Sequence, residues 1–569
     1  MRISNQSSLE ELNSSLVGYL EAKSVYENQS LFGQVFSDRY LYGNYENGFP
    51  VGGRISYVKL ISIIAAFILV IAFINFVNMA TAEATNRMKE IGVKKAIGIY
   101  RSSLIRQFLT ESLLITFFAF IASLFFIYFI LPEFNGITSK QIILSFDWQF
   151  LITVLGITLT TGILAGLYPA FHLSAFSPVR ALKGIASKGR SAQNIRRGLV
   201  VFQFSISTIL IFAVMVVYQQ IDFIQSKNLG FDKENIIWFT SGIPATDGEL
   251  ESLSPEDIEL LLDRLKSISG VSNATNFAQN IVGEYGTTTG LTWEGKNPEQ
   301  GVLFANFSVG YDFINTLNIT VNQGRSFSRD FKTDHEKIIF NQAAIEAMNL
   351  SNPIGKVVEL WGIKREIVGV VHDFHIASLH EDILPTFIKL DVNSFASNIM
   401  VKMKTGNQQI SSVYKDFFID GMPFDFSFLD DNYQRLYENE IKTSTLSKYA
   451  TIVAIIISCL GLFGFANFMV SKRIKEVGIR KVLGASRLAV IKLVTVEFNV
   501  MVLISLLIAF PIGYILLNDW LDGFAFKIAI TQWQVIGGSL IVMLSAWFTI
   551  TAQTLKAVHV NPIDCLKDE

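Results

Sequence analysis

The chain has 569 residues, of which half are hydrophobic and 17% are charged, and its mean hydropathy is +0.39. A soluble protein carries about a quarter charged residues, so this composition argues against a soluble protein and predicts a membrane protein. The net charge of −2 indicates nothing about partners. The two cysteines, Cys459 in an apolar run and Cys565 near the C-terminus, exclude a disulfide framework.

Residues 1–56 are polar and do not have the pattern of a signal peptide, because no basic segment precedes an apolar core. The stretch LEELNSSLVGYLEA (9–22) is typical of a short amphipathic helix, and SLFGQVFS (30–37) is typical of a strand. We therefore expect a small mixed segment before the first apolar run.

Seven apolar runs follow, each long enough at about 20 residues to cross a bilayer as a helix. They are Tyr57–Ala80, Ser112–Leu131, Phe150–Phe171, Leu199–Tyr218, Tyr449–Val470, Phe498–Leu517 and Val535–Leu555. A single long polar stretch, Asp222–Ser447, interrupts them. The predicted fold class is therefore an α-helical polytopic membrane protein with one large domain outside the bilayer.

The short loops differ in their content of Lys and Arg. Two loops carry six each and the loop of residues 471–497 carries seven, whereas the loops on the other side carry only Lys140 and Lys527. Because basic loops stay in the cytoplasm, these loops and the C-terminus are expected inside, and Asp222–Ser447 outside.

The domain at 222–447 mixes two kinds of pattern. Runs typical of strands are NIIWF, VLFANFSV, KIIFN, REIVGVV, TFIKL, NIMVKM and FDFSFL. Runs typical of helices are PEDIELLLDRLKSI, NQAAIEAMNL and QQISSVYKDFF. This mixture predicts an α+β domain.

One stretch occurs twice in the chain. Residues 87–111, RMKEIGVKKAIGIYRSSLIRQFLTE, align without a gap on residues 473–497, RIKEVGIRKVLGASRLAVIKLVTVE, at a constant offset. The offset pairs Glu90 with Glu476 and Gly98 with Gly484. An internal repeat of this kind predicts a duplicated membrane unit.

Within each copy, apolar residues alternate with charges, which predicts a short amphipathic helix. Gly98 and Gly484 suit the position just after its last turn. Such a helix could rest on anionic lipid headgroups, and that alternative stays open. Lipid alone does not explain why an acid recurs at a fixed position in both basic loops.

The repeated KE(I/V)G(V/I)(K/R)K(A/V)(I/L)G loop and the closing SPVRALKG and NPIDCLKD resemble MacB/FtsX-type ABC transporter permeases. The stretch REIVGVVHDFHIASLHE resembles the periplasmic core domain of MacB. The resemblance implies that the two loops are coupling helices, seated in clefts of the ATPase subunits. The residues implied in this contact are Lys89, Glu90, Ile91, Gly92, Lys95, Gly98, Lys475, Glu476, Val477, Gly478, Lys481 and Gly484.

The repeat also predicts the domain organisation. Its second half has a span before the large domain, and its first half has none, so we expect an upstream span and most of a first external domain to be missing. The intact protein would then have eight spans. The expected parts are a domain remnant (1–56), a three-span unit (57–185), a linker and span (186–221), the MacB-like domain (222–447) and a second three-span unit (448–569).

Catalytic and transport motifs of other kinds are weak in this sequence. Gly184–Ser191 has the spacing of a phosphate loop but carries Arg190 in place of lysine, so we expect no enzyme activity, no cofactor, and ATP hydrolysis on a separate subunit. The apolar cores of the spans carry no charged group or histidine, which argues against a secondary transporter. His372, Asp373, His375 and His380 form a candidate zinc cluster, but a structural turn is the preferred interpretation.

The expected function is that of an inner-membrane permease subunit working with two copies of an ABC ATPase. It would transmit ATP-driven movement to the outer domain, which acts on a lipoprotein, peptide or antibiotic already outside. Other expected partners are membrane lipid, a periplasmic adaptor and an outer-membrane channel, with no nucleic acid. The alternative is an FtsX-like signalling or scaffold protein that regulates a cell-wall partner.

Overall fold

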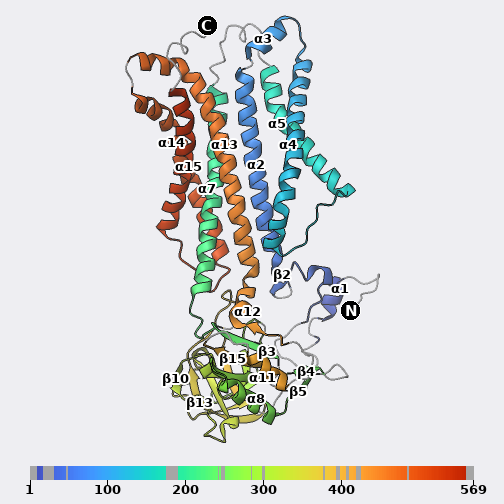
Figure 1. Cartoon of the computed structure of the whole chain (residues 1–569), viewed down its shortest axis with the longest axis vertical. Helices are drawn as coiled ribbons and strands as arrows, with labels where there is room; N and C mark the ends of the chain where they lie inside the picture. The colour runs from blue at the N-terminus through green and yellow to red at the C-terminus, as the bar shows by residue number, and fades with distance from the viewer. Residues whose placement is uncertain are drawn as a thin grey trace. The chain divides into compact units, whose positions relative to one another are not determined.

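The computed structural model describes residues 9–16, 19, 31–46, 49–86, 88–174, 190–240, 242–244, 250–283, 285–297, 301–375, 378–391, 398–404, 409–417, 424–483 and 486–558. SPVRALKG, the linker that follows it to residue 189, and NPIDCLKD lie outside these ranges. The chain divides into two compact units (Figure 1). One is helical (Tyr40–Gln220, Glu440–Trp520, Ala529–Glu569), and the other is α+β (Met1–Arg39, Ile221–Asn439, Leu521–Ile528).

Each predicted span lies inside one long helix. These helices are α2 (Arg54–Asn86), α4 (Arg101–Thr138), α5 (Trp148–Ser174), α7 (Arg190–Ser226), α13 (Glu438–Val482), α14 (Arg487–Leu521) and α15 (Gln532–Val558). All except α5 are long and apolar enough in their described residues to cross a membrane, and α5 has a shorter apolar stretch, Trp148–Leu164. The predicted fold class, a polytopic helical membrane protein with an α+β domain, is confirmed.

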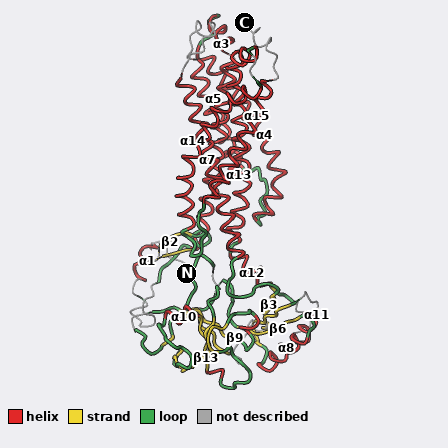
Figure 2. The backbone as a smooth tube through the Cα atoms, turned by 90° about the vertical axis from the view of Figure 1, so that its left-hand side faces the viewer, coloured by secondary structure: helices red, strands yellow, loops and turns green. Residues whose placement is uncertain are grey.

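The α+β unit contains a mixed sheet, whose strands are yellow in Figure 2. The strand order is β16-β3-β15-β6-β9-β14-β11-β13-β12-β8, with β10 beside β13 and β7 beside β9. Pairs β9–β14 and β11–β13 are parallel, and the other described pairs are antiparallel. The strands are β3 (Ile236–Thr240), β6 (Val271–Phe277), β7 (Thr287–Thr288), β8 (Leu291–Thr292), β9 (Phe304–Val309), β10 (Val321–Gly324), β11 (Lys337–Asn341), β12 (Val357–Leu360), β13 (Ile363–Val371), β14 (Thr386–Leu390), β15 (Asn398–Met403) and β16 (Ser427–Phe428). A separate pair joins β4 (Gly242–Pro244) to β5 (Leu250–Ser252).

Two apolar clusters form the core of this unit. In one, α8 (Pro255–Ser267) and α11 (Gln409–Phe417) cover the strands β3, β6 and β15. In the other, α10 (Gln342–Ala347) packs against β9, β11 and β14. The short helices are α9 (Phe313–Thr316), α12 (Leu429–Leu436) and the 3-10 turn η3 (Asp334–Glu336). The expected strands and helices of this domain are therefore present, although FDFSFL contributes only the two residues of β16.

The N-terminal segment differs from expectation in one respect. Helix α1 (Leu9–Leu16) forms within the expected helix, but residues 31–37 of SLFGQVFS are not a strand, and the last two belong to the 3-10 turn η2 (Phe36–Asp38). The backbone of Gly33 bonds instead to the side chain of Asn13, whose amide donates to the carbonyl and whose oxygen accepts from the N–H. A hairpin of β1 (Asn44–Glu46) and β2 (Phe49–Gly52) follows.

Helices α4 and α5 approach closely because of two glycines four residues apart. A Cβ atom at Gly166 would lie 3.0 Å from the Cβ of Ser112, and one at Gly162 would lie 2.9 Å from Leu113. Small residues at this spacing let membrane helices come into direct contact. Gly162 and Gly166 are therefore packing sites between α4 and α5.

We predict that Gly166→Val destabilises the protein by about 1–3 kcal/mol, because the added methyl groups force α4 and α5 apart. The control is Gly156→Val on the same helix, where a Cβ atom meets nothing within 4 Å. The measurement is the thermal midpoint of the detergent-solubilised protein by fluorescence-detected size-exclusion chromatography. Equal midpoints for the two variants would show that the glycines do not carry the contact.

Candidate functional site in the two repeated loops

The two copies of the repeated loop are both helical. In the first copy, residues Met88–Ala96 form α3, which lies between α2 and α4 (Figure 1). In the second copy, the equivalent residues are the last turns of α13. Of the twelve predicted contact residues, the side chains of Lys89, Lys475, Val477 and Lys481, the burial of Gly478 and all of Gly484 lie outside the described part.

Gly98 ends α3 in the way that its position in the sequence predicts. Its φ of 99° lies in the left-handed region, and its N–H donates to the Lys95 carbonyl at 3.0 Å. The N–H of Ile99 donates to the Lys94 carbonyl at 3.1 Å. These two bonds are those of a Schellman motif, in which glycine is favoured because it has no Cβ atom.

The recurring acid has a local partner in both copies. Glu90 pairs with Lys94 at 2.9 Å, and Glu476 pairs with Arg480 at 2.8 Å, each one turn further along the helix. An exposed pair at this spacing stabilises a helix by about 0.2–0.5 kcal/mol. The acid therefore has a structural task in the loop, which accounts for part of its recurrence.

Two lysines of α3 interact with their surroundings. Glu90 pairs with Lys94, and partial burial together with the nearby Arg101 lowers the pKa of Lys95. The amine of Lys94 also donates to the Gln107 side chain of α4 at 3.4 Å. Lys94 is therefore held by an acid of its own helix and by an amide of the next helix.

The inward face of α3 packs on the neighbouring helices. Ile91 is only 5% exposed, and it belongs to a buried cluster with Leu104 and Phe108 of α4 and Ala170 of α5. Gly92 is also buried. Ile91 and Gly92 were predicted as ATPase contacts. In the structure, Ile91 packs α3 against α4 and α5, and Gly92 is buried beside it.

The outward face carries apolar side chains at the same positions in both copies. Ile97 is 78% exposed and its equivalent Leu483 is 80% exposed, while Val93 and its equivalent Ile479 are half exposed. Large apolar groups exposed together on a short helix indicate a surface that another molecule covers. Sequence reasoning missed these four residues, although their recurrence at the repeat offset was a usable signal.

The acids that follow the loops also have partners. Gln107 donates to Glu111 within α4 at 3.1 Å. Glu497 pairs with Arg197 of α7 at 3.4 Å. The second copy is therefore tied to the helix that precedes the α+β domain.

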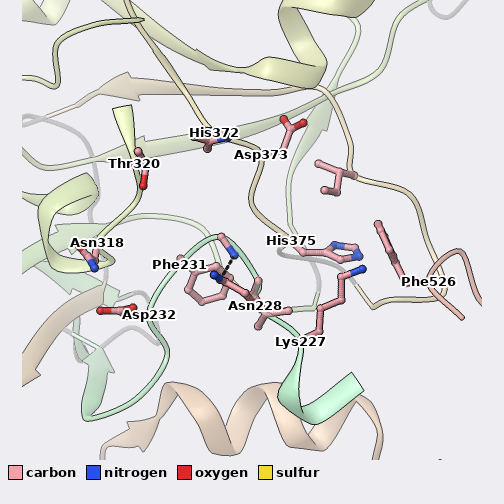
Figure 3. Close-up of a pocket in the computed structure, with 13 residues that line it drawn as sticks. Lys227, Asn228, Phe231, Asp232, Asn318, Thr320, His372, Asp373, His375 and Phe526 are labelled. Carbon is pink, nitrogen blue, oxygen red and sulfur yellow. Dashed lines mark hydrogen bonds between the residues drawn. The ribbon is translucent and has the colours of Figure 1, made fainter. Parts of the chain in front are cut away.

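The candidate zinc residues each contact a different part of the chain. The Asp373 carboxylate accepts from the N–H of Ala343, His380 stacks on Phe524, and the ring of His375 lies 5.1 Å from that of Phe526. Among the described residues, no group of three or more His, Cys, Asp or Glu is placed to hold a metal ion. His375 and Phe526 line a pocket of about 490 Å³ together with Lys227 (Figure 3).

Two family models match the chain. The model for the FtsX-like permease C-terminal domain matches residues 62–178 and 449–562, and the model for the MacB-like periplasmic core domain matches residues 204–412. The first match therefore occurs twice, once in each half of the repeat. Together the two models cover most of the chain.

Curated relatives agree with these matches. The uncharacterised ABC transporter permease YknZ of Bacillus subtilis is 29% identical over 46% of this chain and 68% of its own length. The macrolide export ATP-binding/permease protein MacB of Bdellovibrio bacteriovorus is 32% identical over 22% of this chain, and the match spans only 19% of that protein. Among solved structures, the periplasmic region of MacB from Actinobacillus actinomycetemcomitans aligns with 37% of this chain and 97% of its own, at 16% identity and a TM-score of 0.27.

We predict that the α+β unit loses stability as the pH falls below 6.5. Burial, followed by the charge of Lys227, lowers the pKa of His375 from 6.5 to about 4, and this side chain is only 3% exposed. The folded unit therefore holds a neutral imidazole, and the unfolded chain takes up the proton first. The loss approaches about 3 kcal/mol as an upper bound near pH 4.

Hydrogen exchange of β13 in the full chain, corrected for intrinsic rates at pH 7 and pH 5, measures this loss. His375→Phe should remove the pH dependence, whereas the same change at the exposed His335 should leave it intact. A pH dependence that survives His375→Phe would assign the effect to another group.

Proposed function

Because the chain belongs to the MacB/FtsX-type ABC transporter permeases, we propose that it transmits the work of a separate ABC ATPase to the α+β domain. The observation that carries this proposal is the pair of exposed apolar surfaces at Val93 and Ile97 and at Ile479 and Leu483. Two equivalent surfaces on one chain suit two copies of one partner. A chain of this kind supplies both halves of the membrane part.

A protein cleft suits these surfaces better than a lipid headgroup layer. Basic amphipathic helices bind anionic lipid through their cationic charge, and each loop here neutralises one cation with its own acid. Each loop also exposes an apolar pair beside its helix end, which is the form of surface that fills a pocket on a partner.

The Lys and Arg distribution supports an orientation with both loops and the C-terminus in the cytoplasm. The α+β domain then lies outside the inner membrane, where it acts on a substrate that has already crossed. The apolar cores of the spans suit a membrane part that transmits movement better than one that forms a hydrophilic path for a substrate. Among the substrate classes, an antibiotic, a peptide and a lipoprotein all fit, and a periplasmic adaptor and an outer-membrane channel complete an export path.

We predict that trypsin added to intact spheroplasts cuts within Asp222–Ser447 and spares Gly184–Arg197. Both regions contain Lys and Arg, so only the membrane separates them from the protease. The fragments are mapped by mass spectrometry, with lysed spheroplasts as the control in which both regions are cut. Cleavage at Gly184–Arg197 in intact spheroplasts would overturn the orientation.

We predict that Ile97→Asp combined with Leu483→Asp abolishes stimulation of the partner ATPase. Placing a charge in an apolar pocket costs several kcal/mol at a hot spot, so we expect a loss of about 100-fold in affinity. ATP hydrolysis by the reconstituted complex and co-purification of the ATPase are the measurements.

The matched control is Ile143→Asp, an exposed apolar residue in the α4–α5 connection that should change neither quantity. Unchanged stimulation in the double variant, with weaker binding to vesicles of anionic lipid, would favour the lipid alternative instead.

A further inference from the structure

The connection between α14 and α15 is part of the α+β unit, although both helices are membrane spans. By its contacts, Leu521–Ile528 groups with Ile221–Asn439. Leu521 and Phe524 are buried there. A connection between two membrane helices has thus become part of the core of the folded domain.

The first anchor of this connection is a stack of rings. Phe524 lies on the ring of His380 with a centroid distance of 4.0 Å and an angle of 27°. The ring of His380 is also nearly parallel to that of Tyr437, at a centroid distance of 6.3 Å and an angle of 19°. Tyr437 immediately precedes α13, and its hydroxyl accepts from the N–H of Leu379 at 2.6 Å.

The second anchor is Phe526. Its N–H donates to the Leu379 carbonyl at 3.2 Å, and its ring contacts His375. The Lys227 amine lies 3.4 Å from the centre of the same ring (Figure 3). Lys227 follows the last residue of α7, so a second membrane helix ends at this point.

His375, Leu379 and His380, which we call the histidine turn, lie between β13 and β14. They contact residues at the ends of α7 and α13 and in the α14–α15 connection. Both strands pair with β11 in the sheet. Any displacement of these helix ends is therefore applied to one short segment that is continuous with the sheet.

The first repeat lacks these anchors. The repeat offset places Thr138 where Phe524 stands and Lys140 where Phe526 stands. Neither residue has an aromatic ring that could form the stack. The arrangement is therefore specific to the second repeat and does not follow from the family resemblance of the two halves.

We propose that Phe524 and Phe526 fasten the α14–α15 connection to the histidine turn, and that this junction passes movement of the second membrane unit into the sheet. The proposal rests on the proposed function, because it needs an ATPase that moves the helices. A purely structural role for the two rings would leave the response of the sheet to the ATPase intact.

The experiment uses the full chain in complex with its ATPase in lipid nanodiscs. Hydrogen exchange is followed at α3 and at β13, with and without trapping by ATP and orthovanadate. In the wild type, both segments should respond to trapping. In Phe524→Ala with Phe526→Ala, α3 should still respond and the response of β13 should be lost. Phe146→Ala, an exposed ring in the α4–α5 connection, is the control and should behave as the wild type.

A response of β13 in the double variant equal to that in the wild type would overturn the proposal. Failure of α3 to respond in the wild type would instead contradict the proposed function. If the double variant does not fold, as judged by exchange at β9 and β11 without nucleotide, His380 provides a second test. His380→Phe keeps a ring in the stack and should keep the response, whereas His380→Ala should lose it. Equal responses in these two variants would reject the junction.

Discussion

Close approach between helices is the constraint on which the helical unit depends. Lipid tails are as apolar as the side chains of the spans, so burying apolar surface contributes little free energy to the association of membrane helices. Gly461 on α13 leaves room for the amide groups of Asn75 and Gln203, and Asn75 donates to the Ile457 carbonyl at 3.2 Å. Asn75 and Gly461 occupy equivalent positions in the repeat. The two copies of this helix, α2 and α13, therefore carry a large and a small residue at equivalent positions, and the two residues fit together where the helices meet.

The repeated loops divide their residues between shape and contact. Gly98 and the Glu90–Lys94 pair set where α3 ends and how stable it is, and Ile91 fixes it to α4 and α5. None of these tasks requires the exposed Ile97 or its equivalent Leu483. The exposure of these two apolar side chains does not stabilise the loop, so it is most simply explained by contact with a partner. The recognisable motif is therefore mainly the scaffold, and the contact surface that we propose includes Ile97 and Leu483, which differ between the two copies.

Much of this fold could be predicted, because membrane spans and buried strands have strong local patterns. KIIFN, TFIKL and NIMVKM match β11, β14 and β15 residue for residue. Prediction was wrong at SLFGQVFS, where a side chain of α1 satisfies the backbone in place of a neighbouring strand. Strand β6 was missed because VSNATNF has few apolar residues and is buried by pairing with β15 and β9. The contacts of Phe524 and Phe526 join segments far apart in sequence, which no local pattern reveals.

Helix α13 runs without interruption from Glu438 to Val482, and its 45 residues correspond to about 67 Å at 1.5 Å per residue. That is roughly twice the thickness of a bilayer core. A continuous helix changes its length very little, so a push of a few ångströms at Leu483 arrives at Tyr437 almost undiminished. The second repeated loop and Tyr437, which lies near His380, are therefore joined by one continuous helix and move together.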